Sequence, residues 1–366
     1  MNDQPSKAIY FNNLDALRFL SFFSVFVAHT WMTPIPDIGV KAFLFSFATL
    51  DCLLVPFFFT LSSFLITYRL LMEKENKGSI SLLNFYKNRI LRIWPAYYLL
   101  IIVCFVLIPW ISSLLHVQQI SLPPIIPFLF FYANFYIIEH GSAFTFGLLI
   151  LWSISIEEQF YLVWGWFLKF IPAKWITVFI TLLFAFSIAF SYYYLFVQHK
   201  AATNLSIHSI YILQNFCTGA LIAFICVRKK QALSFLQKMP AISFLFAYII
   251  LVVSNYYIAD MVLRNVIKSI CYSLIIYDQA FNEKRLFNAG KFPFVNYLGK
   301  ISYGLYLYHA IIFVILQKQF HLFNYDGQSF IGMNLFHMLI AFIVTFIVSH
   351  ISYRYIESKF LKLKQL

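Results

Sequence analysis

Apolar runs long enough to cross a bilayer recur along almost the whole chain, separated by short polar segments. A helix of about 20 residues spans the ~30 Å hydrocarbon core, because each residue rises ~1.5 Å. The pattern predicts an all-α, polytopic transmembrane helical bundle of about ten spans. These are residues 14–33, 43–71, 91–115, 146–168, 173–198, 206–227, 241–259, 261–281, 298–317 and 331–356.

Two segments differ from simple spans. Residues 79–95 are basic and amphipathic, which predicts a helix along the cytoplasmic membrane surface that enters the bilayer at Pro95. Residues 121–144 are apolar but interrupted by three prolines, which predicts an outer loop packed into the bundle or a re-entrant segment. We expect one integral-membrane domain over residues 1–366, with no appended soluble domain.

The positive charge is unevenly distributed between alternate loops. Of the 27 lysines and arginines, 21 fall in the set of loops that includes both termini. Because basic loops stay on the cytoplasmic side, this asymmetry predicts that the N- and C-termini are both cytoplasmic. The first apolar run has no small-residue cleavage site after it, so we interpret it as an uncleaved anchor helix.

Composition excludes a soluble globular protein, because 61% of the residues are hydrophobic and 11% are charged. A net charge of +13 would suggest nucleic acid in a soluble chain. Here anionic membrane lipid explains the charge better, and we expect no nucleic-acid partner. The five cysteines lie in apolar runs without a CxxC pair, which indicates neither a disulfide framework nor a metal site.

Arg18 and His29 lie eleven residues apart within the first apolar run. Helix geometry places them on nearly one face, about 16 Å apart along the axis. Ionisable groups in a membrane are costly and often mark a substrate path or reaction centre. The pair suits a long anionic ligand whose reactive end reaches His29. The structural alternative is that Arg18 extends to lipid phosphate and His29 forms an interhelical hydrogen bond.

Arg89 and Arg92 share a helix face three residues apart, on the predicted cytoplasmic side. Guanidinium groups bind phosphate in a bidentate manner, so this face is a candidate clamp for a phosphorylated ligand. Ordinary anchoring to lipid headgroups beside Trp94 is the alternative interpretation.

The fourth span carries Ser153 and Glu157, four residues apart on one face, followed by Glu158. Adjacent carboxylates in an apolar span require a polar interior. A carboxylate facing a histidine fixes its tautomer and stabilises its protonated form, as a general base needs. A purely structural Glu–Arg bridge is the alternative.

The ninth span places Tyr303, Tyr306 and His309 three residues apart, which makes one stripe of hydroxyl and imidazole groups. His309 is a candidate for a second catalytic group or a substrate contact. A hydrogen-bonded packing histidine explains the same spacing.

Taken together, these segments resemble the bacterial integral-membrane acyltransferase-3 family, the O-acyltransferases of surface polysaccharides. Arg18 and His29 match its Arg-x10-His, and KNRILRIWPAYYL matches its Arg-x-x-Arg. LWSISIEEQFYLVW matches its Ser-x3-Glu, and GKISYGLYLYH matches its late Ser-Tyr-x-x-Tyr-x-x-His. The chain departs from the family at Pro56 and Ser63, where an acidic residue and a glycine are usual.

The resemblance implies transfer of an acyl group, most often acetyl, from cytoplasmic acyl-CoA to a sugar hydroxyl of a surface glycan or its lipid-linked precursor. The catalytic residues would be His29, Glu157 and Ser153, with His29 as general base or transient acyl carrier assisted by Glu157. Arg18, Arg89 and Arg92 would hold the CoA phosphates. The acceptor would contact Tyr303, Tyr306, His309 and Glu158. The family also implies the bacterial cytoplasmic (inner) membrane and no metal.

Two other functions stay open from the residues alone. One is a transporter or flippase that moves a glycan or lipid-linked sugar without chemistry. The other is an ion-coupled carrier that uses Glu157, Glu158 and His309 as a proton relay. Basic groups gathered on the cytoplasmic side beside a histidine favour an enzyme with a nucleotide-like donor over the flippase and the carrier. The sequence indicates neither the oligomeric state nor the acceptor.

Overall fold

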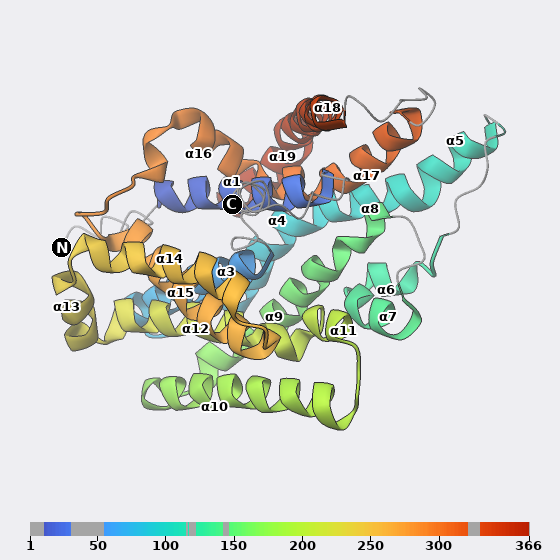
Figure 1. The fold of residues 1–366 in the computed structure, drawn as a ribbon. Coiled ribbons are helices and arrows are strands. Elements are labelled where there is room, and N and C mark those ends of the chain that lie inside the picture. Colours follow the sequence, from blue (N-terminus) through green and yellow to red (C-terminus); the bar gives the residue numbers. More distant parts are fainter. Residues whose placement is uncertain are drawn as a thin grey trace.

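The structure is a computed structural model that describes residues 11–30, 55–114, 116, 122–141, 146–320 and 330–365. Every regular element in these ranges is a helix (Figure 1). This is expected of a lipid-embedded chain, because a helix satisfies its backbone hydrogen bonds internally where no water can. The predicted all-α class is confirmed for this part of the chain.

The longer helices overlap the predicted apolar spans, although α4 begins before the span predicted at 91–115. Residues 31–33, 43–54 and 115 of the predicted spans lie outside the described residues. The first half contains α1 (Asn12–Thr30), α3 (Val55–Lys77), α4 (Leu82–Ile102), η1 (Val103–Leu107), α5 (Ile108–Leu114), α6 (Ile126–Leu129), α7 (Ala133–His140), α8 (Phe146–Leu149), α9 (Leu151–Phe170), α10 (Ala173–Tyr192) and η2 (Tyr193–Val197). The second half contains α11 (Ala202–Ser206), α12 (Ser209–Arg228), α13 (Lys230–Lys238), α14 (Ala241–Tyr257), α15 (Met261–Phe281), η3 (Ala289–Lys291), α16 (Pro293–Lys300), α17 (Ser302–Phe320), α18 (Phe330–Ser352), η4 (Tyr353–Glu357), α19 (Ser358–Lys362) and η5 (Leu363–Gln365).

Within the described residues, five helices are long and apolar enough to cross a membrane. A sixth span results if α16 and α17, which meet at a bend of 70°, are counted together. The helices α1, α9 and α15 are not among the five, and each carries charged residues that lower its hydropathy. The prediction of ten spans with both termini in the cytoplasm therefore stays a prediction.

The helix that was expected to enter the bilayer at Pro95 runs through this residue without a break, and its entry point into the bilayer stays a prediction. Pro95 lies inside α4, and the helix continues through η1 and α5 as one apolar stretch of 33 residues, Leu82–Leu114. The side chain of Ser81 caps its first turn by accepting a hydrogen bond from the Asn84 N–H. At ~1.5 Å per residue the stretch is about 50 Å long, well beyond the ~30 Å hydrocarbon core.

The helices α3 and α12 form the centre of the bundle. The Ser63 hydroxyl donates to the Phe216 carbonyl at 2.6 Å, and the Phe216 ring stacks on Phe160 of α9 with centroids 3.9 Å apart. The backbones approach most closely at Gly219, where a Cβ atom would lie 2.2 Å from the Thr60 carbonyl oxygen. Small residues that allow such approach are a general device for helix association in membranes.

Residues 122–141 form two short helices that pack against the bundle, and the assignment of this segment as an outer loop or a re-entrant segment stays a prediction. Phe128 of α6 is buried, and its carbonyl accepts a hydrogen bond from the Tyr97 hydroxyl of α4 at 2.7 Å. On α7, Asn134 accepts from the Gln159 amide of α9 at 2.9 Å. These bonds satisfy irregular backbone and amide groups that lipid could not satisfy.

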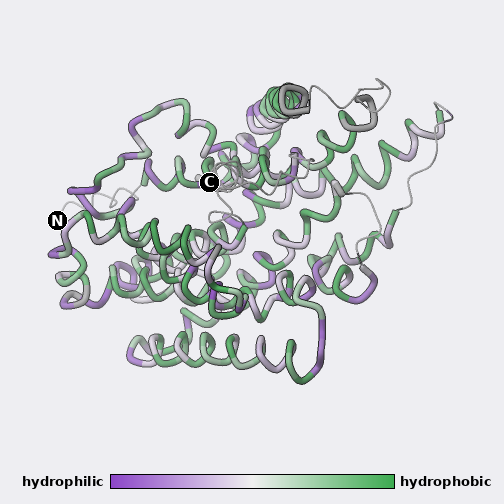
Figure 2. Tube along the Cα trace, viewed as in Figure 1, coloured by the Kyte–Doolittle hydropathy of each residue, from purple (hydrophilic) through white to green (hydrophobic). Residues whose placement is uncertain are grey.

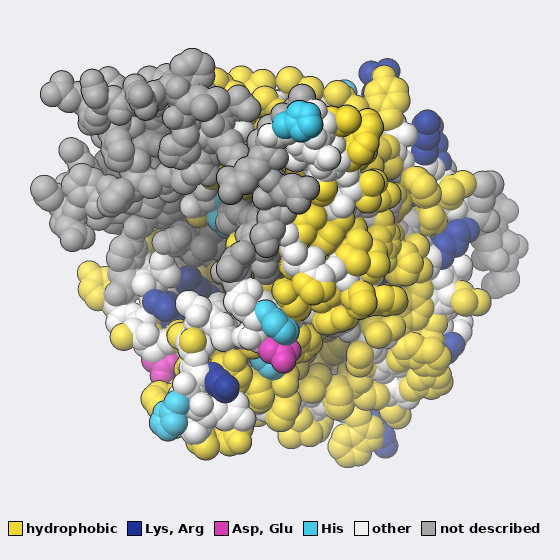
Figure 3. All heavy atoms as spheres, turned by 90° about the vertical axis from the view of Figure 1, so that its right-hand side faces the viewer, with side chains coloured by type: hydrophobic (Ala, Val, Ile, Leu, Met, Phe, Trp, Pro, Cys, Tyr) yellow, Lys and Arg dark blue, Asp and Glu magenta, His cyan; other side chains and the backbone are white. Residues whose placement is uncertain are grey.

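The outer surface of the described bundle is largely apolar. Figure 2 shows hydrophobic residues along the helices, with hydrophilic ones gathered at helix ends and turns. Figure 3 shows that apolar side chains cover most of the described part of one face. The outer helices α10, α14 and α18 expose large apolar side chains such as Leu182, Phe246 and Leu339. An apolar surface of this extent suits contact with lipid, and the chain is a multi-pass membrane protein.

The contact at Gly219 predicts a stability effect. We expect Gly219→Val to destabilise the fold by about 1–3 kcal/mol, because the branched side chain would meet the α3 backbone at Thr60. Thermal unfolding of the purified protein, followed by the loss of the monodisperse species, measures the change. Ala185→Val adds volume at an exposed position of α10 and should leave the transition unchanged. Equal transitions for Gly219→Val and wild type would contradict this packing.

Candidate active site

A cavity of about 110 Å³ opens between α1, α3, α4, α9 and α17 and collects most of the predicted site residues. Seven of the ten predicted residues line it: Arg18, Arg89, Arg92, Ser153, Glu157, Tyr303 and Tyr306. Glu158, His29 and His309 lie outside its lining. Residues from four separate sequence motifs therefore converge on one space, with the arginines in its wall together with Ser153 and Tyr306.

Arg18 is held by a carboxylate on its own helix. Its Nη1 forms an ion pair with Oδ1 of Asp15, one helical turn earlier, and the Asp15 side chain is 5% exposed. An acidic residue in the first turn also faces the positive end of the helix dipole. Arg18 is thus a compensated charge whose guanidinium still lines the cavity.

Arg89 reaches the cavity from α4. Its guanidinium lies over the Tyr161 ring, 5.7 Å from the centroid, where a cation is attracted by the electron-rich face of the ring. Its Nε is buried and makes no hydrogen bond within the described residues. Arg89 therefore has donor capacity in the wall of the cavity, and Arg92, one turn further along α4, lines the same wall.

Glu157 lies on the arginine side of the cavity. It interacts with the hydroxyl groups of Ser62 and Tyr161 and with the charges of Arg89 and Arg18. The Ser62 and Tyr161 hydroxyls are themselves hydrogen-bonded to each other. The described interactions of Glu157 thus support a role in balancing arginine charge.

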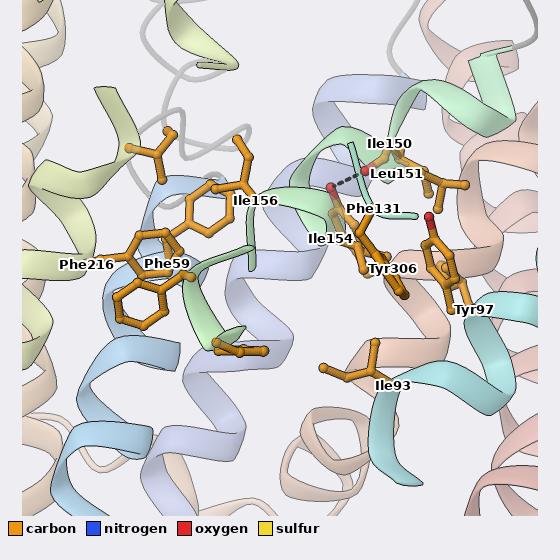
Figure 4. Packing of buried hydrophobic residues seen from close by; sticks show 14 of the residues in the cluster. Phe59, Ile93, Tyr97, Phe131, Ile150, Leu151, Ile154, Ile156, Phe216 and Tyr306 are labelled. Atoms are coloured by element: carbon orange, nitrogen blue, oxygen red, sulfur yellow. Dashed lines mark hydrogen bonds between the residues drawn. The ribbon is translucent and has the colours of Figure 1, made fainter. Parts of the chain in front are cut away.

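Ser153 joins α9 to α17. Its hydroxyl donates to the Ile150 carbonyl at 2.9 Å and is 2.7 Å from the Tyr306 hydroxyl. Because the Ser153 proton is directed to Ile150, the Tyr306 hydroxyl is the donor in the second bond. The Tyr306 hydroxyl also lies 3.5 Å from the Ile150 carbonyl, the dashed line in Figure 4. Tyr306 is therefore fixed at the cavity wall.

His29 and His309 form a hydrogen-bonded pair next to Tyr306. Their rings are nearly parallel, with an interplanar angle of 6° and centroids 5.2 Å apart, and His29 Nδ1 lies 2.9 Å from His309 Nε2. His309 Nδ1 lies 2.6 Å from the Tyr306 carbonyl oxygen. His309 is fully buried, whereas His29 is partly exposed. The structure thus joins two histidines that are 280 residues apart in the sequence.

Glu158 and Tyr303 both contact α4. The Trp94 indole N–H donates to Glu158 Oε2 at 3.2 Å, and the Tyr303 hydroxyl donates to the Ile93 carbonyl at 2.9 Å. The first contact holds the middle of α9, and the second holds the start of α17, beside the face of α4 that carries the arginines. Tyr303 also lines the cavity, which keeps it within reach of a ligand.

Three residues of the site were not singled out from the sequence. Asp15 had a local signal, because it precedes Arg18 by one helical turn. Tyr161 follows Glu157 by four residues, which also places it on the same face. Ser62 had no such signal, since its partner Tyr161 lies on another helix.

The part of the chain that the structure describes contains no candidate metal cluster and no disulfide. No group of three or more His, Cys, Asp or Glu side chains in this part of the chain is arranged to hold a metal ion. The described cysteines, Cys104, Cys217, Cys226 and Cys271, are free thiols in apolar surroundings. Cys52 lies outside the described residues.

Comparison with known proteins gives consistent matches over nearly the whole chain. A family model described as "Acyltransferase domain" matches residues 11–354. A protein of Staphylococcus aureus strain COL, provisionally named an O-acetyltransferase, is 25% identical over 97% of this chain and 58% of its own length. A peptidoglycan O-acetyltransferase of Listeria monocytogenes is 32% identical over 46% of this chain and 25% of its own length.

A third relative, from Bacillus subtilis and provisionally named a peptidoglycan O-acetyltransferase, is 26% identical over 95% of this chain and 54% of its own length. The chain therefore spans little more than half the length of the relatives that it matches from end to end. No solved structure gives a significant match.

The bond between Ser153 and Tyr306 predicts a measurable coupling. We expect Ser153→Ala to lower the free energy of unfolding by about 1–3 kcal/mol, because it leaves the buried Tyr306 hydroxyl without this partner. Ser254→Ala is the matched control, since the buried Ser254 hydroxyl bonds only its own helix at the Leu251 carbonyl. When Ser153→Ala is combined with Tyr306→Phe, the free energy of unfolding should fall by less than the sum of the two single changes. Strict additivity would contradict the bond.

Proposed function

The chain belongs to the acyltransferase-3 family, and on that basis we propose that it is a membrane O-acyltransferase. It transfers an acyl group, most simply acetyl, from cytoplasmic acyl-CoA to a sugar hydroxyl of a cell-surface glycan or its lipid-linked precursor. The relatives' names support O-acetylation, and two of them name peptidoglycan as the acceptor. The proposed location is the cytoplasmic (inner) membrane of a bacterial cell.

The observation that carries this proposal is the composition of the cavity. Arginines 18, 89 and 92 line it together with Ser153 and Tyr306, and the histidine pair adjoins Tyr306. An acyl-CoA has the matching polarity, with phosphates at one end and a thioester at the other. Guanidinium groups bind phosphate oxygens through charge-assisted hydrogen bonds, and so the arginines would hold the donor with its thioester directed toward His29.

The hydrogen bonds of the histidine pair select a tautomer for His29. The Tyr306 carbonyl can only accept, so His309 Nδ1 carries the proton that it receives. In the neutral ring His309 Nε2 is then an acceptor, and His29 Nδ1–H donates to it. This places the lone pair of neutral His29 on Nε2, the nitrogen that a general base would use. We therefore assign the orientation of His29 to His309, and charge balance among the arginines to Glu157.

The proposed reaction follows from this tautomer. His29 Nε2 removes the proton of the acceptor hydroxyl as its oxygen attacks the thioester carbonyl. The new C–O bond forms, the C–S bond breaks, and the CoA thiolate takes up the proton from His29. The Nδ1–H donated to His309 stabilises the imidazolium formed between these steps. A variant of the same proposal has His29 carry the acyl group transiently before the sugar attacks.

The direct test is acyl transfer in membranes that contain this chain. With radiolabelled acetyl-CoA and a glycan or lipid-linked sugar acceptor, we expect label in the acceptor fraction and a loss of at least about 100-fold in His29→Ala. The exposed His140 on α7 supplies the control, and His140→Ala should transfer label at the wild-type rate. Wild-type turnover by His29→Ala would exclude this mechanism. Sugar movement without transfer from any acyl donor would favour the flippase.

Variants of His309 distinguish a residue that orients His29 from one that takes part directly in the reaction. A glutamine can accept the His29 Nδ1–H through its amide oxygen, so His309→Gln should keep a substantial part of kcat. His309→Leu removes the acceptor and should lower kcat about 10- to 100-fold with little change in the KM for acetyl-CoA. Steady-state kinetics on protein of equal folded fraction measures both effects. A complete loss in both variants would instead make His309 a reacting group.

A further inference from the structure

A second cavity, of about 210 Å³, lies between α3, the beginning of α4 and the C-terminal η5. It shares Arg89 with the candidate active site, so this arginine forms a common wall between the two spaces. The polar lining of this second cavity consists of Arg69, Glu73, Asn84, Asn88, Arg89 and Lys364. None of Arg69, Glu73 and Lys364 belongs to the motifs that identify the family.

This second cavity is electropositive. Three cationic side chains line it against the single carboxylate of Glu73, which accepts a hydrogen bond from the Ser81 backbone N–H at 3.3 Å. Arg69 is solvent-exposed and interacts with the charges of Arg89, Arg18 and Arg92. Like charges gathered in one recess repel one another, and an anion bound there relieves the repulsion.

Lys364 adds an independent sign of this repulsion. It lies in η5, beyond the last candidate span, and is half-buried. Burial and the nearby charges of Arg92, Arg89 and Arg69 lower the pKa of Lys364 to about 7. At neutral pH the lysine is therefore only partly protonated, and a bound anion would restore its full charge.

We propose that this second cavity binds the ribose 3′-phosphate of the CoA donor, with Arg69 and Lys364 as phosphate ligands and Arg89 shared with the pyrophosphate. The inference rests on the proposed function, since it assigns a further part of the same donor. CoA carries its pyrophosphate and its 3′-phosphate on one ribose, at the 5′ and 3′ positions. Two basic cavities that share one arginine match two anionic groups that share one sugar ring.

The proposal makes the protein selective for CoA over dephospho-CoA. In nanodiscs of phosphatidylcholine alone, we expect Arg69→Gln to raise the KM for acetyl-CoA about tenfold and to leave the KM for acetyl-dephospho-CoA within about twofold. Lys364→Gln, at the periphery of the fold, should act in the same direction. Lys87→Gln is the matched control: it removes one exposed charge of α4 that lines neither cavity, and both KM values should stay unchanged.

Direct binding tests the cavity without turnover. The purified protein should bind adenosine 3′,5′-bisphosphate about tenfold more tightly than 5′-AMP, and Arg69→Gln should abolish most of that preference. Equal affinity for the two nucleotides, or equal KM changes for both donors, would overturn the proposal. A defect that appears only after anionic phospholipid is added would assign the cavity to lipid headgroups and also overturn it. Absence of transfer from either donor in the wild type would refute the proposed function. The nucleotide preference would still decide whether the second cavity binds a 3′-phosphate.

Discussion

A guanidinium inside an apolar bundle requires a compensating charge, and the pairing of Arg18 with Asp15 meets this constraint for Arg18. Removing one partner of a buried ion pair costs on the order of 3–5 kcal/mol, because the other charge stays uncompensated. The same turn of α1 also contacts α16, where a Cβ on Gly299 would lie 1.9 Å from the Asp15 carbonyl oxygen. The 70° bend between α16 and α17 then directs Tyr303 and Tyr306 to the cavity.

Local patterns in the sequence predicted the helices and much of the site. Apolar periodicity places helices where α3, α10 and α12 lie, because a span must satisfy its own backbone hydrogen bonds. Polar residues in such spans are costly, so Arg18 and Glu157 were visible as site candidates, and the structure brings them to one cavity. The continuity of α4 through Pro95 was not evident from the sequence; a proline disturbs one turn of a helix, and the neighbouring turns continue the same apolar stretch.

Relations between distant helices could not be predicted in the same way. The spacing of Ser153 and Glu157 placed them on one face of a helix, and the structure adds that Ser153 accepts from Tyr306 while Glu157 lies on the arginine side. The contact between His29 and His309 depends on how α1 packs beside α17, which no local pattern encodes. Arg69 and Lys364 are ordinary basic residues in the sequence until the fold places them around one recess.

The length of α4 and its continuations has a consequence for the surrounding bilayer. A stretch of 33 residues exceeds the hydrocarbon thickness, so the helix must tilt, protrude or locally thicken the membrane. The third turn of α4 carries Arg89, while Arg18 lies on the separate helix α1. A thinner bilayer that increases the tilt of α4 therefore changes the distance between these two arginines. The acyl-chain length of the host lipids thus becomes a physical variable that affects the spacing of Arg18 and Arg89.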